Sequence, residues 1–310
     1  MTELMATRDG YGNALVKLGA ERNDVVVLDA DLSKSTRTEM FEKNYPDRFF
    51  NIGVAEQDLI GTAAGLALGG KTVFASSFAI FASGRAWEQI RNSVCIDKLD
   101  VKIVATHGGI SVGPDGASHQ AIEDITIMRV IPNIKVVVPC DGISAEKLIL
   151  EAAETPGPFY IRLGRSKVPK IISVDQEIKI GKGIVLKEGE DVLIISCGML
   201  TPEALGAADI LKEKGISAGV VDMHTIKPID IELLKQACKK YKKIVTVEEH
   251  SILGGLGGAV AEALMEIPGQ KPDFLRLGLK DEFGQSGEMN QLIKAYGLDS
   301  EGIAKAISNC

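Results

Sequence analysis

The feature that most constrains this chain is a repeated alternation of short apolar runs with segments of helical periodicity. In the first half, apolar runs typical of strands cover residues 25–28, 71–76, 101–106, 134–138 and 159–163. Helical patterns between them cover residues 55–68, 85–97, 119–129 and 142–154. Strands that are apolar throughout and separated by helices indicate a parallel sheet covered on both faces.

A second alternation follows a change of pattern at residues 166–188. This stretch alternates apolar and charged residues around Pro169, Gly181 and Gly183, which is typical of an exposed connector. Beyond it, strands are expected at residues 192–195, 218–222 and 243–248, and helices at residues 201–214, 231–240 and 257–265 and again after Gly287 and Ser300. We predict an α/β fold of two tandem doubly wound domains, the first with a mainly parallel sheet and the second smaller. The expected limits are residues 1–168, an extended linker at 169–186, and residues 187–310.

Charge and cysteine content exclude several classes of function. The formal net charge of the 310 residues is −7, so no general basic surface for nucleic acid is expected. The five cysteines contain no CxxC pair, which argues against a disulfide framework and a thiolate zinc site. No apolar run approaches the ~18 residues that a membrane span needs. We therefore expect a cytoplasmic protein that binds neither nucleic acid nor membrane.

One carboxylate, Glu56, stands at a junction where open α/β folds place their chemistry. It lies in the run NIGVAEQ at residues 51–57, after a short strand pattern and at the start of an apolar helix. Active-site residues gather at the carboxyl ends of parallel strands. An acid in the first helical turn is also favoured by the helix dipole alone. From this run by itself, both a catalytic and a purely local role for Glu56 stay open.

A long glycine-rich loop after the strand at 101–106 holds two of the four histidines. His107 and His119 flank Asp115 in this loop. Neutral histidines and a carboxylate can exchange protons and bind a polyhydroxylated substrate. The alternative is a flexible loop with surface histidines. Zinc is less favoured, because no third soft ligand stands at motif spacing.

Three other features have a functional and a structural interpretation. Phe78 and Phe81, three residues apart after a strand, could stack on a flat heterocycle or belong to the core. Arg8 and Arg165 could grip phosphate oxygens or form surface ion pairs. The run GGLGG at residues 254–258 could cradle phosphate, but it lacks both the GxGxxG spacing and the P-loop lysine. Tight backbone packing at a helix start is therefore the favoured interpretation of that run.

Taken in order, these motifs resemble the C-terminal half of a transketolase. The likeness covers essentially the whole chain as a pyrimidine-binding domain followed by a transketolase C-terminal domain. Its strongest parts are residues 51–57 (NIGVAEQ), 77–81 (SFAIF), 113–120 (GPDGASHQ) and 163–165 (LGR).

The resemblance implies thiamine diphosphate chemistry. Glu56 corresponds to the family glutamate that bonds to the cofactor's aminopyrimidine ring and so activates the cofactor to attack a ketose carbonyl. Phe78 and Phe81 correspond to the aromatic wall around that ring, with Phe81 as the stacking residue. Asp31 corresponds to an acid near the cofactor at the subunit interface. Gly84 stands where transketolases usually have a tyrosine, so this part of the pocket is thinner.

The same resemblance assigns a substrate site. His107, Asp115 and His119 correspond to residues that contact the sugar hydroxyls, and both histidines are expected to be catalytic. The anchors of the sugar phosphate are expected to be Arg8, Ser35 and Arg165.

A large departure from the family pattern concerns the metal and the diphosphate. The chain has no Gly-Asp-Gly followed by a distant Asn-Asn pair, the family's motif for the metal that holds the diphosphate. Transketolases carry this motif in an N-terminal domain. The resemblance therefore implies a split enzyme in which a partner chain binds Mg²⁺ and the diphosphate, while this chain supplies no metal ligand. We expect an α2β2 assembly in which two copies of this chain form a dimer about a two-fold axis.

Three alternatives remain. The β subunit of 2-oxoacid dehydrogenases has a similar size and domain order, but it lacks the pattern of His107, Asp115 and His119. Deoxyxylulose-phosphate synthase shares the DGxxHQ pattern and resembles the chain from residue 281 onward, yet it does not usually have a histidine at position 107. A non-catalytic assembly module that kept only the fold is the third alternative.

Overall fold

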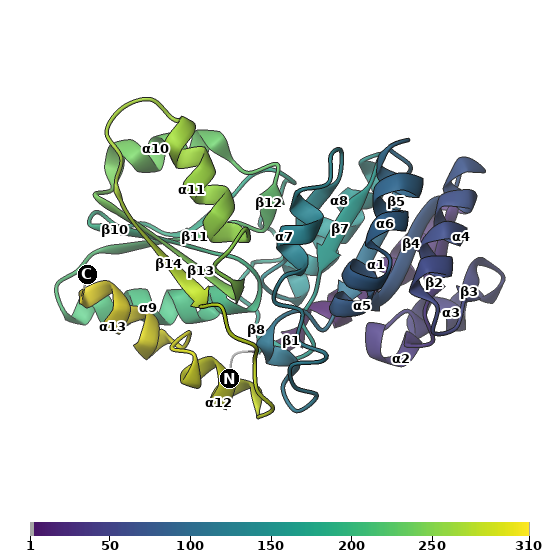
Figure 1. Ribbon diagram of the computed structural model, residues 1–310, viewed down its shortest axis with the longest axis horizontal. Helices are drawn as coiled ribbons and strands as arrows, with labels where there is room; N and C mark the ends of the chain where they lie inside the picture. The colour runs from purple at the N-terminus through teal and green to yellow at the C-terminus, as the bar shows by residue number, and fades with distance from the viewer. Residues whose placement is uncertain (1–2, 310) are drawn as a thin grey trace.

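The computed structural model describes residues 3–309 as two α/β domains that lie next to each other (Figure 1). The first domain contains a seven-stranded sheet of order β12-β6-β7-β5-β4-β2-β3, parallel except for β12. Its strands are β2 (Val25–Asp29), β3 (Phe49–Asn51), β4 (Thr72–Phe78), β5 (Val101–Thr106), β6 (Lys135–Val137), β7 (Phe159–Arg162) and β12 (Thr225–Lys227). The expected α/β architecture with a mainly parallel first sheet is confirmed.

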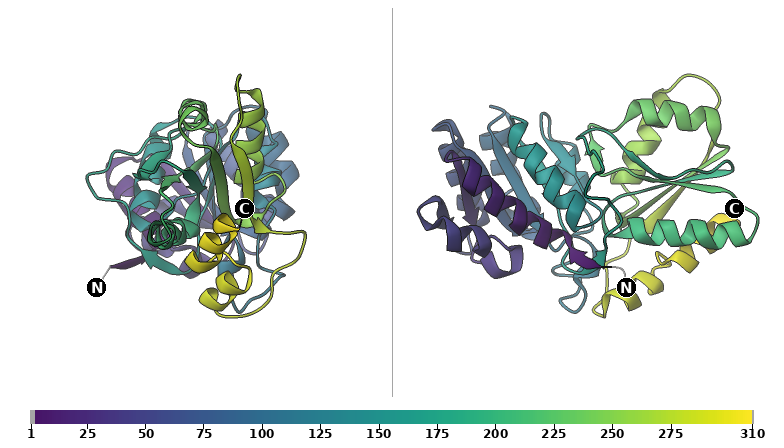
Figure 2. Two further views of the ribbon diagram at one scale, coloured as in Figure 1. Left: turned by 90° about the vertical axis from the view of Figure 1, so that its left-hand side faces the viewer. Right: turned by 180° about the vertical axis from the view of Figure 1, so that it is seen from behind.

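Helices cover both faces of this sheet, because successive strand residues point to opposite sides. Val25 and Val27 of β2 pack with α1 and α8, whereas Val26 and Leu28 pack with α4 and α5. Figure 2 shows α1 and α8 next to each other on one face, seen from behind. The helices of this domain are α1 (Thr7–Glu21), α2 (Ser33–Thr36), α3 (Glu39–Asn44), α4 (Glu56–Leu68), α5 (Ala79–Arg85), α6 (Trp87–Gln89), α7 (Asp124–Arg129) and α8 (Gly142–Glu154).

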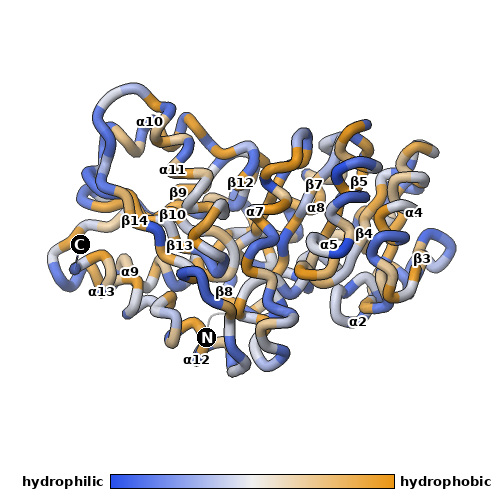
Figure 3. Tube along the Cα trace, in the orientation of Figure 1, coloured by the Kyte–Doolittle hydropathy of each residue, from blue (hydrophilic) through white to orange (hydrophobic). Residues whose placement is uncertain are grey.

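The second domain repeats the plan with a five-stranded sheet of order β14-β13-β10-β11-β9. Only β9 runs antiparallel to its neighbour. Its strands are β9 (Ile184–Lys187), β10 (Val192–Ser196), β11 (Ala218–Asp222), β13 (Lys243–Ser251) and β14 (Asp273–Leu279). Its helices are α9 (Thr201–Glu213), α10 (Ile231–Lys240), α11 (Leu256–Glu266), α12 (Met289–Ala295) and α13 (Ser300–Ser308). Figure 3 shows hydrophobic residues recurring along the strands of both sheets, with hydrophilic residues at many of the turns.

The connector between the domains is partly paired into strands. Within it, β8 (Lys167–Pro169) pairs antiparallel with β1 (Leu4–Ala6) near the start of the chain. The strand β12, which lies between β11 and α10 in sequence, pairs antiparallel with β6 and completes the edge of the first sheet. The domain limits given above remain a prediction.

Several elements differ from the sequence expectation, and α7 and α1 are two of them. The helix expected at residues 119–129 begins only at Asp124, because the preceding residues close the glycine-rich loop: Gly109 N–H donates to the carbonyl oxygen of Ala121 at 2.8 Å. The helix α1 is not indicated by the apolar pattern. Its Gly10 lies so close to α8 that a Cβ there would be 2.0 Å from the carbonyl oxygen of Gly142.

Within residues 3–309, no helix is both long and apolar enough to cross a membrane.

Candidate active site

Glu56 is buried at the first position of α4. Its side chain is 3% exposed. The Ser77 hydroxyl donates to Glu56 Oε1 at 3.2 Å, and Arg85 Nη1 lies 3.3 Å from Oε2. The helix dipole stabilises the ionised carboxylate at this end, as it would for any first-turn acid. A first-turn acid favoured only by the dipole would normally face water, whereas this carboxylate is turned into the protein and is bound by two other elements.

Two aromatic rings stand next to this carboxylate. Phe78 ends β4 and Phe81 lies in α5, and their ring centroids are 6.2 Å apart with the planes inclined by 21°. The Arg85 guanidinium lies over the Phe81 ring at 4.1 Å from its centroid. Phe78 is buried, as its core interpretation required, but Phe81 is half-buried. The Phe81 ring can therefore receive a flat cation or heterocycle.

His107 stacks on Phe78. Its ring centroid lies 3.9 Å from that of Phe78, and its Nδ1 is 2.8 Å from the Thr106 hydroxyl. The backbone at His107 has a φ of 60°, a conformation that non-glycine residues rarely adopt. The pKa of His107 is lowered to about 3, first by burial and then by the positive charge of Arg8. Near neutral pH, His107 is therefore an uncharged hydrogen-bonding group.

His119 and Asp115 come from the far part of the same loop. The His119 ring meets Phe81 edge-on with centroids 5.3 Å apart, and Nδ1 lies 3.0 Å from the Ser118 hydroxyl. Asp115 is exposed and lies 3.6 Å from Arg165 Nη1. The loop thus returns to the aromatic pair at both of its ends, instead of extending as a mobile surface loop.

The arginines gather at the edge of this cluster. Arg8 Nη1 donates to the carbonyl oxygen of Ser35 at 2.8 Å, and Arg165 Nη1 donates to that of Val112 at 2.8 Å. Arg37 pairs with Asp9 at 2.7 Å. Burial lowers the pKa of Arg8, and the charges of Arg37 and Arg165 lower it further. Several guanidinium groups near one another, with a buried Arg8 Nε that has no hydrogen-bond partner, fit an anion such as phosphate.

Asp31 lies apart from these contacts. It follows β2 with a φ of 62°. Its carboxylate accepts a hydrogen bond from the Asn51 side chain at 3.0 Å, and its own N–H donates back to Asn51 at 3.1 Å. The structure thus joins Phe78, Phe81, His107 and His119 in one cluster of rings and links Glu56 to Phe81 through Arg85. It pairs Arg8 with Ser35 and Arg165 with Asp115 at the edge of this cluster, and it leaves Asp31 bound to Asn51.

Three residues of the site were not predicted from the sequence. Arg85 looks like an ordinary surface cation on a helix, and its side chain is 53% exposed, yet it bridges Glu56 and Phe81. Ser77 begins the run SFAIF at residues 77–81, but no role was assigned to its hydroxyl group. Arg37 is distinguished only by its positive φ of 74°, which the sequence does not reveal.

The glycine run at residues 254–258 is a packing feature. The Glu248 carboxylate occupies the N-terminus of α11, where it accepts hydrogen bonds from the N–H groups of Leu256 at 2.7 Å and Gly257 at 2.8 Å. A Cβ on Gly255 would lie 2.1 Å from Glu248 Oε2. The protein's own carboxylate fills the position that a phosphate would take. Among residues 3–309, no cluster of three or more His, Cys, Asp or Glu could hold a metal ion.

Comparisons with known proteins follow the same division into two parts. Residues 3–170 match the transketolase pyrimidine-binding domain, and residues 181–303 match the transketolase C-terminal domain. A protein of Methanocaldococcus jannaschii with the provisional name transketolase C-terminal section is 56% identical over 302 residues, covering 97% of this chain and 94% of the relative. One of the subunits of the apulose-4-phosphate transketolase of Phocaeicola vulgatus is 37% identical over 303 residues, covering 97% of this chain and 96% of the relative.

A solved structure has the same fold over its whole length. It is described as a split-gene transketolase in an inactive beta4 tetramer, and it superimposes with a TM-score of 0.91 at 52% identity. The match covers 98% of both chains.

Proposed function

The chain belongs to the transketolase family, and from this premise we propose that it is the C-terminal subunit of a split transketolase. Together with an N-terminal chain, thiamine diphosphate and Mg²⁺, it would transfer a two-carbon ketol unit from a ketose phosphate to an aldose phosphate. The observation that carries this proposal is the buried carboxylate of Glu56 beside the half-buried ring of Phe81, with His107 and His119 against the same aromatic pair.

The residues present fit the aminopyrimidine half of the cofactor. Glu56 is buried, yet its two side-chain partners are one neutral hydroxyl and one half-exposed guanidinium. The guanidinium of Arg85, a flat cation that stacks on Phe81 and bonds Glu56, shows that a planar nitrogen-containing group can satisfy both residues at once. Thiamine diphosphate, when bound, supplies a carbanion that the protein's side chains cannot generate.

Each side chain has a definite task in this scheme. Glu56 would hold a proton at a ring nitrogen of the aminopyrimidine, and Phe81 would hold the ring plane. His107, uncharged near neutral pH because burial lowers its pKa, would donate or accept a hydrogen bond at a sugar hydroxyl. His119 would move a proton at the same sugar, with Asp115 at a neighbouring hydroxyl.

The substrate phosphate has a charged site of its own. Arg8 and Arg165 would bind it as forked donors, and Ser35 would act by positioning Arg8 through its carbonyl oxygen. Asp31 would contribute at the subunit interface, outside the contacts described above. A relative named for apulose-4-phosphate suggests that the sugar differs among members of this family, so we propose a ketose phosphate as the substrate class.

We propose that a partner chain supplies the metal and diphosphate site, since residues 3–309 contain no cluster of His, Cys, Asp or Glu that could hold a metal ion. The similar structure described as an inactive beta4 tetramer supports this proposal, because it contains the β chain of a split transketolase without activity. We propose an α2β2 complex whose N-terminal chains bind Mg²⁺ and the diphosphate. His107 stacked on Phe78 favours ketol transfer over the reactions of deoxyxylulose-phosphate synthase and 2-oxoacid dehydrogenases, whose patterns do not usually include this histidine.

The test compares two acids in the same helical turn. Glu56→Gln should lower kcat of the complex by about 10²–10⁴-fold, the usual contribution of a positioned proton donor, with the fold intact by circular dichroism. Asp58→Asn removes an exposed acid from the first turn of α4, so it alters the helix-end electrostatics alone and should leave kcat near normal. Near-normal turnover in Glu56→Gln would overturn the mechanism. Turnover by the isolated chain with cofactor would overturn the partner requirement.

A further inference from the structure

The end of the glycine-rich loop (residues 107–120) is held by the second domain. Gln120 is buried, with 2% of its surface exposed. Its Nε2 donates to the carbonyl oxygen of Ile110 at 3.2 Å, within the loop, and to that of Gln285 at 2.9 Å. Gln285 belongs to the segment between β14 and α12. One side-chain amide therefore joins the two parts of the loop to the second domain.

The loop and this segment are in contact with no room for additional atoms. A Cβ on Gly284 would lie 2.0 Å from Gln120 Oε1, and a Cβ on Gly116 would lie 2.4 Å from Ser286 Oγ. On Gly113, a Cβ would approach the carbonyl oxygen of Gly287 to 3.1 Å. A methyl group at these glycines would therefore require the Gln120 or Ser286 side chain, or the backbone at Gly287, to shift. Residues 284–287 therefore restrict the position of this part of the loop.

A second attachment holds the beginning of the loop. Glu249 of β13 accepts a hydrogen bond from the Ser111 N–H at 3.1 Å. Glu249 and Arg162 are both buried, and Arg162 Nη2 donates to the carbonyl oxygens of Glu249 at 3.1 Å and Ala121 at 3.0 Å. The Ser251 N–H, also from β13, donates to the carbonyl oxygen of Ile122 at 2.8 Å. The second domain thus contacts both ends of the loop.

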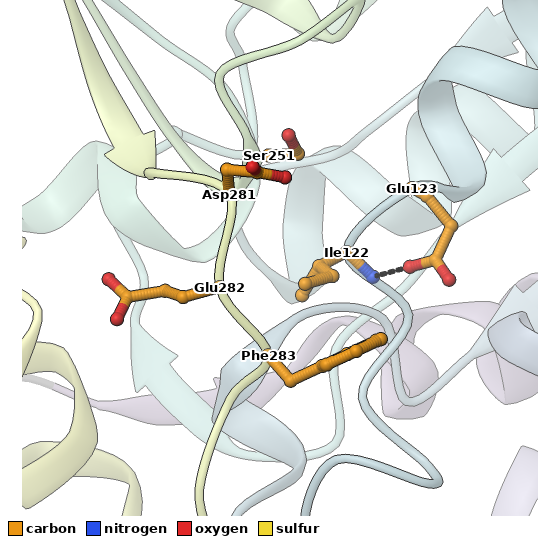
Figure 4. Close-up of a pocket in the computed structure, with 6 residues that line it drawn as sticks. All are labelled: Ile122, Glu123, Ser251, Asp281, Glu282 and Phe283. Carbon is orange, nitrogen blue, oxygen red and sulfur yellow. Dashed lines mark hydrogen bonds between the residues drawn. The ribbon is translucent and has the colours of Figure 1, made fainter.

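Between these attachments lies a pocket of about 240 Å³. It is lined by Ile122 and Glu123, just after the loop, and by Ser251, Asp281, Glu282 and Phe283 of the second domain. Figure 4 shows the Phe283 ring beside Ile122, whereas the Glu282 side chain points away from it. The Glu123 carboxylate accepts a hydrogen bond from the Ile122 N–H at 2.8 Å, so it binds its own backbone and does not bridge the pocket. The direct link from this segment to the loop is therefore made beyond the pocket, at residues 284–287.

We propose that the second domain positions the substrate-contacting loop, and that Gln120 is the positioning residue through which it acts. This inference rests on the proposed function for the identity of the substrate. Asp115 and His119 lie between Gly113 and Gln120, so a displaced anchor displaces both side chains. Glu56 and Phe81 come from α4 and α5, and the contacts described for them include no residue of this segment. Loss of the anchor should therefore weaken sugar binding and spare the cofactor.

The experiment uses the complex of the full chain with its N-terminal partner. In Gln120→Met, which keeps the size of the side chain but removes both donors, the KM for the ketose phosphate should rise at least about tenfold. A tenfold change corresponds to about 1.4 kcal/mol, close to the loss of one or two hydrogen bonds. The dissociation constant of thiamine diphosphate, measured by calorimetry, should be unchanged. Gln285→Ala is the matched control and should resemble the native protein, because Gln285 contributes its main-chain carbonyl.

A substitution in the second domain tests the same contact between Gln120 and residues 284–287. Gly284→Ala should raise the KM as Gln120→Met does, and it provides the test if Gln120→Met fails to fold. Gly258→Ala, where the nearest atom to the new Cβ is 3.9 Å away, is its control and should be silent. An unchanged KM in both Gln120→Met and Gly284→Ala, or an equal loss of cofactor affinity, would overturn the proposal.

Hydrogen exchange separates this proposal from the proposed function. Amides of residues 108–121 should lose protection in Gln120→Met, whereas those of α8 should not, and neither measurement needs a substrate. If the native complex transfers no ketol unit but Gln120→Met still loses protection at residues 108–121, the proposed function is refuted and the positioning role is supported. Retained protection with normal ketol transfer would refute the positioning role alone.

Discussion

The stability of the isolated chain should fall in mild acid because His107 is buried without charge. The pKa of its ring is lowered from 6.5 to about 3, first by burial and then by the positive charge of Arg8. The unfolded chain binds a proton at this histidine as the pH falls through about 6.5, and the folded chain does not until the pH approaches about 3. Stability contributed by neutral His107 is therefore fully present above about pH 6.5 and is lost progressively below it.

The size of the effect follows from this difference in pKa. With one extra proton bound by the unfolded state, the free energy of unfolding falls by about 1.4 kcal/mol per pH unit. Between about pH 7.5 and about pH 5, the contribution of His107 amounts to about 2 kcal/mol. The side chain is 3% exposed, so solvent screening reduces this figure little.

Urea unfolding at a series of pH values measures the slope, and a substitution isolates it. His107→Gln should be less stable near neutral pH, because the Phe78 ring loses the imidazole that stacks on it. The free energy of unfolding of this variant should fall by about 2 kcal/mol less than that of the native chain over the same pH range. His224→Gln provides a comparison, since burial also lowers the pKa of His224, to about 4. The test compares how steeply the free energy of unfolding depends on pH in each variant, and the absolute stability of a variant does not decide it.

Direct titration gives the outcome that would refute the reasoning. The chain has four histidines, so their ring signals can be assigned by substitution in isotope-labelled protein. His107 should remain neutral throughout the range in which the chain stays folded. A midpoint above about pH 6 would contradict the argument. Replacing Arg165 with Met removes one of the charges that lower the pKa of His107, so its midpoint should move upward.

Two further substitutions test the phosphate site and the second domain. Arg8→Met should raise the KM of the complex for a ketose phosphate by about 10- to 100-fold, as expected for losing a hydrogen bond to a charged group. Turnover of the unphosphorylated ketose should be unchanged. Equal effects on both sugars would contradict a role of Arg8 in binding phosphate. Gly255→Ala should lower the free energy of unfolding by about 1–3 kcal/mol, because its Cβ meets the Glu248 carboxylate, and Gly258→Ala measured by the same thermal unfolding should not.

The sequence predicted well those elements whose cause is local. The strand β5 and the helix α8 fall at the expected residues, and α8 begins with a reciprocal capping box between Asp141 and Ser144. The predicted start of α7 was wrong because the residues before it form hydrogen bonds with the loop and with β13. No local sequence pattern shows these long-range bonds. The glycines of α1 look like helix breakers in sequence, yet Gly10 is needed for the close approach to α8.

The site could be predicted where a residue type itself carries the chemistry. Glu56, Phe81 and His119 were expected together, and the structure brings them to one place. The roles assigned to them remain predictions. Arg85 could not be found in the same way, because its two contacts depend on where α5 lies relative to α4. The anchoring of Gln120 could not be found either, because its partner is a carbonyl oxygen 165 positions away in the sequence.

The antiparallel pairing of β12 with β6 has a consequence for how such an enzyme can be divided. The last strand of the seven-stranded sheet is supplied by residues that follow the start of the second domain. A fragment that stopped at residue 168 would leave β6 as an open, apolar sheet edge, which invites pairing with other chains. The boundary between these two domains is therefore a poor place to cut the polypeptide. A break at a point where no sheet is shared would leave no such edge.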